Sequence, residues 1–344
     1  MEQLHQNEVH WLSNVLKRLY LTDKETMKQV TADLLGLQAQ FNANPYYSLK
    51  IRSKDYNEIK VVEDYVKTWS FRGTIHLVHK DDLSLHLSAR GHTDWSDYWG
   101  MKATEKQPWA DFILSEIKAG KTTRNQLKES CLHQNMSEEH FSAVFHGWGG
   151  LLQEMCLQGL IAYQPTNKKE FIILDPVTFI DQSEARAEVI KQYFATYGPA
   201  TLNDCAYFTS YKITEIKGLI EKFQIELNRL EIEKKTYYYL GELLSGVEVP
   251  EIILLAGFDP LILGYKDKSR FIDETLRYKY VTNTGIIFPG ILINGKLGAR
   301  WQKNRNTIVV KPYQKLLVRQ KKEITKQLLT VFPELSIEFE SSIL

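Results

Sequence analysis

The 344 residues are 43% hydrophobic and 25% charged, with a formal net charge of +1, which is the composition of an ordinary globular protein of about two to four domains. No run reaches the roughly 18 apolar residues of a membrane span, and the first residues lack a basic and then apolar signal, so we expect a cytoplasmic protein. The cysteines, Cys131, Cys156 and Cys205, lack metal-ligand spacing and are too few for a disulfide framework, which predicts reduced, mostly buried thiols.

Residues 1–100 are predicted to hold three helices followed by a strand. Apolar residues recur at helical spacing in residues 11–20, and again in a second helix that leads to Gln40. A third helix is predicted for residues 58–69, and residues 74–79 have the pattern of a strand. This order is compatible with a helix-turn-helix unit that carries a β wing.

Two further segments repeat the order of three helices and a hairpin. In the first, the patterns cover residues 109–119, 122–130, 137–158 and 160–174; in the second, they cover residues 184–197, 202–208, 213–223 and 227–240. Three segments of similar order predict a tandem array of winged helix-turn-helix units, a repeat of architecture rather than of residues.

The last hundred residues change to short strands. Strands are predicted at residues 252–256, 285–289, 291–293, 296–301, 307–310 and 336–340, with a helix at residues 322–332. Asn294-Gly295 predicts a type I′ hairpin turn. The predicted fold is therefore mainly α with α+β elements, in four parts: winged-helix units over residues 1–100, 101–182 and 183–247, and a basic, β-rich α+β domain over residues 248–344.

The near-neutral net charge hides one basic segment. Residues 264–322 contain fourteen Lys or Arg against three acids, an excess of +11. Such a block is typical of a protein that binds a polyanion, because each phosphate neutralised by a cation releases counterions. The alternative is a solvated basic face without a partner.

Two glutamines form the candidate chemical site. Val30, Leu34 and Leu37 fall at helical spacing, and Asn44-Pro45 is predicted to stop that helix. Gln38 and Gln40 would diverge if the last turn is helical, but would point the same way in an extended exit.

Around the pair, Asn42 and Asn44 add amides, with Tyr46 and Tyr47 behind them, and we take Asn42 and Tyr46 as pocket residues. Asp33 lies one to two turns back. A patch without an acid argues against ordinary acid–base catalysis and favours a reaction whose leaving group needs little help.

Other motifs carry little chemistry. The sequence has no phosphate-binding loop, dinucleotide fingerprint, nucleophile elbow or zinc signature, and His76 and His79 would lie on opposite faces of a strand, so we expect no metal and no cofactor. Trp95, Tyr98, Trp99 and Trp109 either stack on extruded bases or belong to a core.

Four blocks of sequence together resemble the AlkZ/YcaQ winged-helix DNA glycosylases. They are residues 34–47, 67–78, 255–270 and 285–295, which contain Leu-Gly-Leu-Gln-Ala-Gln, Trp-Ser-Phe-Arg-Gly-Thr-Ile-His, Gly-Phe-Asp-Pro-Leu-Ile-Leu-Gly-Tyr-Lys-Asp and Pro-Gly-Ile-Leu-Ile-Asn-Gly. The resemblance covers most of the chain, in the same order.

The resemblance implies tandem winged helices that bind double-stranded DNA and excise N7-alkylated purines, interstrand crosslinks included, without a metal or cofactor. The family's catalytic motif is glutamine, an aliphatic residue, then glutamine or aspartate, and Gln38-Ala39-Gln40 matches the glutamine form. It therefore assigns the catalytic role to Gln38 and Gln40, and the absence of a lysine from the motif predicts hydrolysis to an abasic site rather than lyase chemistry.

We expect Lys296, Arg300, Lys303 and Arg305 to contact DNA phosphates, and Arg72 to do so at the first wing. The expected protein is a monomer without membrane contact. Two alternatives remain: a winged-helix DNA-binding protein without catalysis, such as a regulator or architectural factor, and a protein-interaction module.

Overall fold

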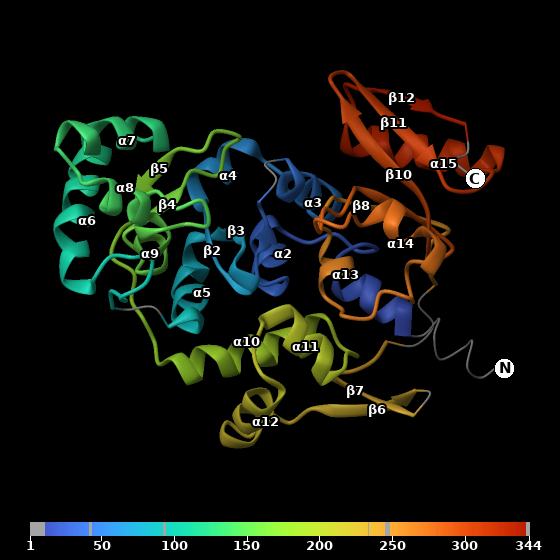
Figure 1. Cartoon of the computed structure of the whole chain (residues 1–344). Helices are drawn as coiled ribbons and strands as arrows, with labels where there is room; N and C mark the ends of the chain where they lie inside the picture. The colour runs from blue at the N-terminus through green and yellow to red at the C-terminus, as the bar shows by residue number, and fades with distance from the viewer. Residues whose placement is uncertain (1–10, 41–42, 92–93, 233, 245–247, 342–344) are drawn as a thin grey trace. The chain divides into compact units, whose positions relative to one another are not determined.

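The computed structural model describes residues 11–40, 43–91, 94–232, 234–244 and 248–341, and Figure 1 shows their helices and strands. The chain forms two compact units. The first combines Met1–Tyr56 with Ile190–Leu344, and the second is Asn57–Val189. The units do not coincide with the four consecutive segments predicted above, whose identity as winged-helix units stays a prediction.

The second unit is built from helices and a small antiparallel sheet. Its helices are α4 (Glu58–Asp64), α5 (Leu83–Arg90), α6 (Ala103–Lys118), α7 (Arg124–His133), α8 (Glu138–Val144) and α9 (Leu151–Leu157). Its strands are β2 (Tyr65–Trp69), β3 (Ile75–His79), β4 (Ile161–Tyr163) and β5 (Phe171–Ile173), in the order β3-β2-β4-β5. The predicted β4–β5 hairpin is confirmed.

The main core of this unit lies among α6, α7, α8, α9 and the β4–β5 hairpin. Ile113, Leu127 and Met155 are fully buried there. Trp95, Trp99 and Trp109 pack against the same core, whereas Tyr98 is 66% exposed. Three of the four aromatic residues that were considered for base stacking are therefore packed into the fold.

Two helix predictions in this unit are wrong. The predicted helix 58–69 ends at Asp64, because the β-branched and aromatic residues from Tyr65 onward form strand β2. The predicted helix 137–158 is interrupted between Val144 and Leu151. Gly150 takes a positive φ of 65°, which a continuing helix does not allow.

The first unit also mixes helices and strands. Its helices are residues 11–18, α2 (Met27–Asp33), α3 (Asn44–Arg52), α11 (Leu202–Thr209), α12 (Ile213–Lys222), α13 (Pro260–Leu263), α14 (Glu274–Tyr280) and α15 (Val318–Val331), together with the last residues of α10 (Gln182–Thr196). Its strands are β1 (Leu37–Gln38), β6 (Asn228–Ile232), β7 (Lys235–Tyr239), β8 (Ile252–Leu255), β9 (Gly290–Ile293), β10 (Lys296–Asn304), β11 (Thr307–Pro312) and β12 (Ser336–Phe339). The predicted β6–β7 hairpin is confirmed.

A five-stranded sheet with the order β12-β11-β10-β9-β8 organises the C-terminal part of this unit. Its β11–β12 pair is parallel and the others are antiparallel. Asn294 and Gly295 both have positive φ, 51° and 79°, as the predicted type I′ turn requires. Helix α15 packs on the sheet and buries Ile324 and Leu328 beside Trp301.

Residues 285–289 do not form the predicted strand. Ile287 makes only an isolated bridge with Val281, Gly285 turns the chain at a φ of 81°, and Pro289 has no N–H to donate. Helices α13 and α14 were not predicted.

Cys131, Cys156 and Cys205 are buried free thiols, as predicted, and burial raises the pKa of each. Of the helices in the described part of the chain, none combines the length and apolarity needed to cross a bilayer.

Candidate functional site

The Gln38-Ala39-Gln40 segment leaves helix α2 through a sharp turn. Helix α2 ends at Asp33, and Leu35 and Gly36 then adopt positive φ values of 55° and 76°. These angles reverse the chain, and Gln38 falls in the short extended strand β1. Asn44-Pro45 does not stop a helix, contrary to prediction; the two residues begin the next one, α3, where the fixed φ and missing N–H of the proline are favourable.

Burial alternates along the extended exit. Leu37 and Ala39 are 1% and 4% exposed, whereas Gln38 is half-buried and Gln40 is exposed. A period of two is the side-chain repeat of an extended chain, which favours the alternative in which both amides point the same way. Ala39, between them, points into the protein.

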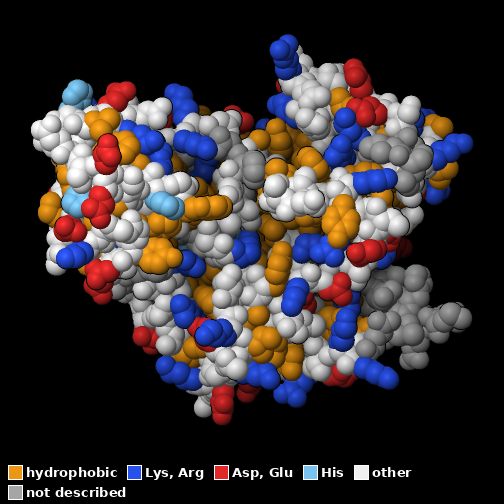
Figure 2. Space-filling view, in the orientation of Figure 1, with side chains coloured by type: hydrophobic (Ala, Val, Ile, Leu, Met, Phe, Trp, Pro, Cys, Tyr) orange, Lys and Arg blue, Asp and Glu red, His pale blue; other side chains and the backbone are white. Residues whose placement is uncertain are grey.

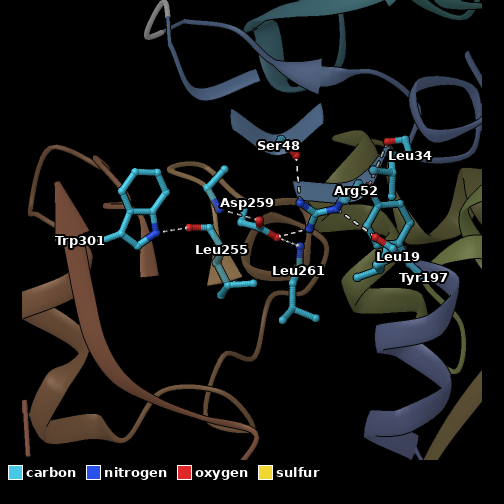
Figure 3. Close-up of polar contacts among 10 residues, drawn as sticks. Leu19, Leu34, Ser48, Arg52, Tyr197, Leu255, Asp259, Leu261 and Trp301 are labelled. Carbon is cyan, nitrogen blue, oxygen red and sulfur yellow. Dashed lines mark hydrogen bonds and ion pairs between the residues drawn. The ribbon is translucent and has the colours of Figure 1, made fainter. Parts of the chain in front are cut away.

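The backbone before the glutamines is anchored by α10 and the turn that follows it. The Tyr197 hydroxyl donates to the Leu34 carbonyl at 3.0 Å (Figure 3). The Gln192 amide donates to the Asp33 carboxylate at 3.1 Å, and the Tyr20 hydroxyl donates to the same carboxylate. Burial and the hydrogen bond to Asp33 raise the pKa of Tyr20. The Asp33 carboxylate therefore accepts hydrogen bonds that fix the end of α2.

The helix that follows the glutamines, α3, is held at its last residue by a buried ion pair. Arg52, the last residue of α3, has a fully buried guanidinium whose Nη2 lies 2.6 Å from Oδ1 of the fully buried Asp259 (Figure 3). Its Nε donates to the Leu19 carbonyl at 2.9 Å, and its Nη1 donates to Ser48 Oγ at 3.0 Å.

Asp259 is itself held by backbone amides. The Leu261 N–H donates to Oδ1 at 2.9 Å, and the Ala256 N–H donates to Oδ2 at 3.0 Å. These bonds compensate the desolvated carboxylate, as a buried pair requires. Leu255, the residue before Ala256, is also held, because the Trp301 indole N–H donates to its carbonyl at 3.0 Å (Figure 3).

Other residues near the glutamines in sequence have separate places. Asn42 lies outside the described residues. Asn44 begins α3, and its side chain lies so close to Gly257 that a Cβ there would be 2.6 Å from Asn44 Oδ1. Tyr46 is half-buried. Its pKa is raised mainly by burial and to a smaller extent by the nearby Tyr56. Tyr47 packs on Trp301 in the core, with ring centroids 5.5 Å apart.

Arg72 belongs to the second unit and is held beside a neutral histidine. It has a positive φ of 57°, and its Nη2 lies 3.4 Å from His76 Nε2. His76 Nδ1 lies 3.1 Å from the Thr74 carbonyl, to which it donates. Burial, then the Arg72 charge, hold the pKa of His76 well below its usual range, so Nε2 faces Arg72 as an acceptor.

The four basic residues of strand β10 and its turn do not form one cluster. Lys303 and Arg305 are exposed at the tip of the β10–β11 hairpin, where Figure 2 shows basic side chains. Arg300 lies over the Phe288 ring at 4.7 Å, and Lys296 donates to the Ser269 carbonyl at 3.0 Å. Lys303 lies seven positions beyond Lys296 along the strand, a distance of about 23 Å.

Sequence reasoning missed the residues that hold the ends of α2 and α3, on either side of the glutamines, namely Arg52, Asp259, Gln192 and Tyr197. One signal was available: Asp259-Pro260 has an N-cap residue followed by a proline suited to the first helical position, and Asp259 does cap α13. Nothing in the sequence indicates that its partner is Arg52, since 207 residues separate the two.

The chemistry available to the glutamines is that of neutral amides. Each supplies an acceptor oxygen and two donor hydrogens without a charge of its own, which suits the orientation of water and the stabilisation of a nearby positive charge. Among the described residues, no group of three His, Cys, Asp or Glu is arranged to hold a metal ion.

Comparisons with known proteins agree with one another. A family model described as "DNA glycosylase AlkZ-like" matches residues 31–330. An interstrand DNA cross-link repair glycosylase from Streptomyces sahachiroi is 22% identical over 311 residues, which cover 83% of this chain and 84% of that protein. The solved structure of the S. sahachiroi DNA glycosylase AlkZ superposes with a TM-score of 0.78 at 20% identity, covering 96% of this chain and 98% of that one.

Proposed function

Because the chain belongs to the AlkZ-like DNA glycosylase family, we propose that it hydrolyses the N-glycosidic bond of N7-alkylated purines in double-stranded DNA and leaves an abasic site. Interstrand crosslinks are included among the substrates, which the name of the S. sahachiroi relative supports. The reaction needs no metal or cofactor, because alkylation at N7 makes the base cationic and weakens its bond to the sugar.

The observation that carries this proposal is the Gln38-Ala39-Gln40 segment, whose two amides alternate with buried residues on an extended backbone that the Tyr197 hydroxyl holds at Leu34. Departure of the base leaves an oxocarbenium-like sugar. The amide oxygens of Gln38 and Gln40 face that developing positive charge and orient the attacking water. A well-held backbone keeps the two amide groups in this orientation during the reaction.

DNA binding is assigned to the winged-helix units over residues 1–100, 101–182 and 183–247 and to the β-rich domain over residues 248–344. Arg72, Arg300, Lys303 and Arg305 are the proposed phosphate contacts. Lys296 is a weaker contact, because its ammonium is already engaged by the Ser269 carbonyl. The protein acts as a monomer in the cytoplasm.

The test is incubation with a duplex that carries a single N7-methylguanine, followed by mild alkaline cleavage. The expected result is strand scission with the native protein and a loss of at least about a hundredfold in the single-turnover rate with Gln38→Ala/Gln40→Ala. The affinity for the duplex should remain within about threefold, since the phosphate contacts are elsewhere.

The matched control is Gln134→Ala, which removes an exposed glutamine at the end of α7 and should leave both quantities unchanged. If the double variant lost affinity in parallel with turnover, the two glutamines would be structural and the assignment wrong. Absence of scission by the native protein on methylated and crosslinked duplexes would contradict the proposed substrate class.

A further inference from the structure

A pocket of about 630 Å³ lies beside the start of α11, within the first unit. Strand β7 and residues 265–270 form its other walls. Its lining combines aromatic rings with cations, namely Trp11, Tyr237, Tyr238 and Tyr265 with Lys235, Lys266 and Arg270. This volume is within the range of small-molecule sites, and the pocket contains neither glutamine of the proposed catalytic segment.

Arg270 makes cation–π contacts with two rings of this pocket. Its guanidinium carbon lies 4.2 Å from the Trp11 ring centroid and 4.5 Å from that of Tyr237, and Nη2 donates to the Tyr237 hydroxyl. The cation–π contacts themselves use none of the N–H donors of the guanidinium; the bond to the Tyr237 hydroxyl uses one of them. Among the described residues, Tyr237 is the only hydrogen-bond acceptor that Arg270 has, so other N–H donors of this pocket-lining guanidinium have no acceptor there.

The two acids of the lining are already compensated. The Asp204 carboxylate accepts from the Thr201 N–H and hydroxyl and from the Lys266 N–H. Asp267 accepts from Ser269 and lies 3.6 Å from Lys235, and the Ser269 hydrogen bond, more than the Lys235 charge, lowers the pKa of its carboxyl. The exposed Lys266 ammonium forms no ion pair with any residue that the structure describes.

We propose that this pocket binds the phosphate group of a nucleotide through Lys266 and the free edge of Arg270. A planar guanidinium edge matches two phosphate oxygens, and a lysine adds a point charge. The aromatic walls offer apolar surface to the attached sugar and base. The phosphate belongs either to a DNA strand, in which case the site extends the proposed DNA-binding function, or to a free nucleotide.

The experiment is isothermal titration calorimetry of the full chain with three probes: inorganic phosphate, deoxyadenosine monophosphate and a short undamaged duplex. Lys266→Gln is the principal variant, because this exposed side chain has no ion pair to lose and the fold should tolerate the change. Arg270→Lys keeps the charge but removes the fork. The control is Lys322→Gln, an equal change of charge at an exposed position of α15.

The expected result is a loss of about tenfold or more in affinity for at least one probe with Lys266→Gln and with Arg270→Lys, and less than about twofold with Lys322→Gln. An effect on the mononucleotide and phosphate identifies a free nucleotide, and an effect on the duplex alone identifies a DNA phosphate. Affinities for all three probes that are unchanged by Lys266→Gln, or changed equally by Lys322→Gln, would overturn the proposal. Because the titrations involve no base excision, failure of the glycosylase assay would not affect them.

Discussion

Arg52 is buried at the last position of α3, the helix that follows the candidate site in sequence. Its charge is fully buried, and its bonds join the end of α3 to Leu19 and to Asp259 (Figure 3). A buried pair adds modest net stability when intact, but loss of one partner leaves an uncompensated charge in the interior. The main effect of removing Arg52 would therefore be the buried, unpaired Asp259 carboxylate that remains.

We expect Arg52→Met to lower the free energy of unfolding by about 3–5 kcal/mol, because the Asp259 carboxylate would stay buried without its partner. Urea denaturation measures this change. The control is Lys17→Gln, which breaks an exposed ion pair of 3.3 Å with Asp23 and should cost less than about 1 kcal/mol. Similar losses for the two variants would show that the buried pair is not critical.

Some residues of the candidate site and its surroundings could be predicted from the sequence, and others could not. Gln38 and Gln40 could be proposed from the sequence because the candidate motif is local. The Arg52–Asp259 pair could not, because it joins residues 207 positions apart, and no local pattern encodes that contact. Lys296 and Arg300 were predicted to act alike, but their side chains have different neighbours, Ser269 and Phe288, that only the folded sheet supplies.

At the scale of elements, the break between α8 and α9 depends on Gly150. A Cβ at this position would lie 2.3 Å from the Ala143 carbonyl oxygen and 2.5 Å from that of Val144, both backbone atoms that cannot move aside easily. The positive φ adds strain for any other residue. The chain thus turns where the helical pattern of residues 137–158 would have continued.

Gly150→Ala should therefore destabilise the second unit by about 3 kcal/mol, from strain and overpacking together. Gly120→Ala is the matched control: Gly120 has a φ of 89° with no atom within 4 Å of its Cβ position, so strain alone should cost about 1 kcal/mol. Chemical denaturation of the two variants gives both values. Equal losses would mean that the close approach to Ala143 and Val144 relaxes at no cost.

Hairpins were more predictable than helix ends. The β4–β5 hairpin and the Asn294-Gly295 turn follow from turn residues that the sequence displays directly, and the β6–β7 hairpin was predicted from its two strand-like runs. Strand β2 was predicted as part of a helix. Its first four residues are all buried, so buried and exposed positions do not alternate, and a short segment without that alternation does not distinguish a strand from a helix. Helix α13 has only four residues, too few for a periodic pattern.

At the scale of the whole molecule, charge is unevenly distributed along a chain whose net charge is only +1. The sequence located the basic segment but not its geometry. In the structure, Lys303 and Arg305 are exposed at a hairpin tip, while Arg300 and Lys296 are partly engaged by neighbouring groups. The tip residues can therefore approach a phosphate without first giving up a contact that the structure describes.

Removal of both tip charges should reduce the salt dependence of DNA binding. Each phosphate contact contributes about −0.9 to the slope of log K against log salt concentration, so Lys303→Gln/Arg305→Gln should make that slope shallower by about 1.8. Fluorescence anisotropy with an undamaged duplex at several salt concentrations measures it. The control, Lys322→Gln/Lys326→Gln, removes the same charge from exposed positions of α15 and should leave the slope nearly unchanged. An equal change in the two variants would show that DNA responds to the total charge of the protein, and the hairpin tip would then have no special role in binding.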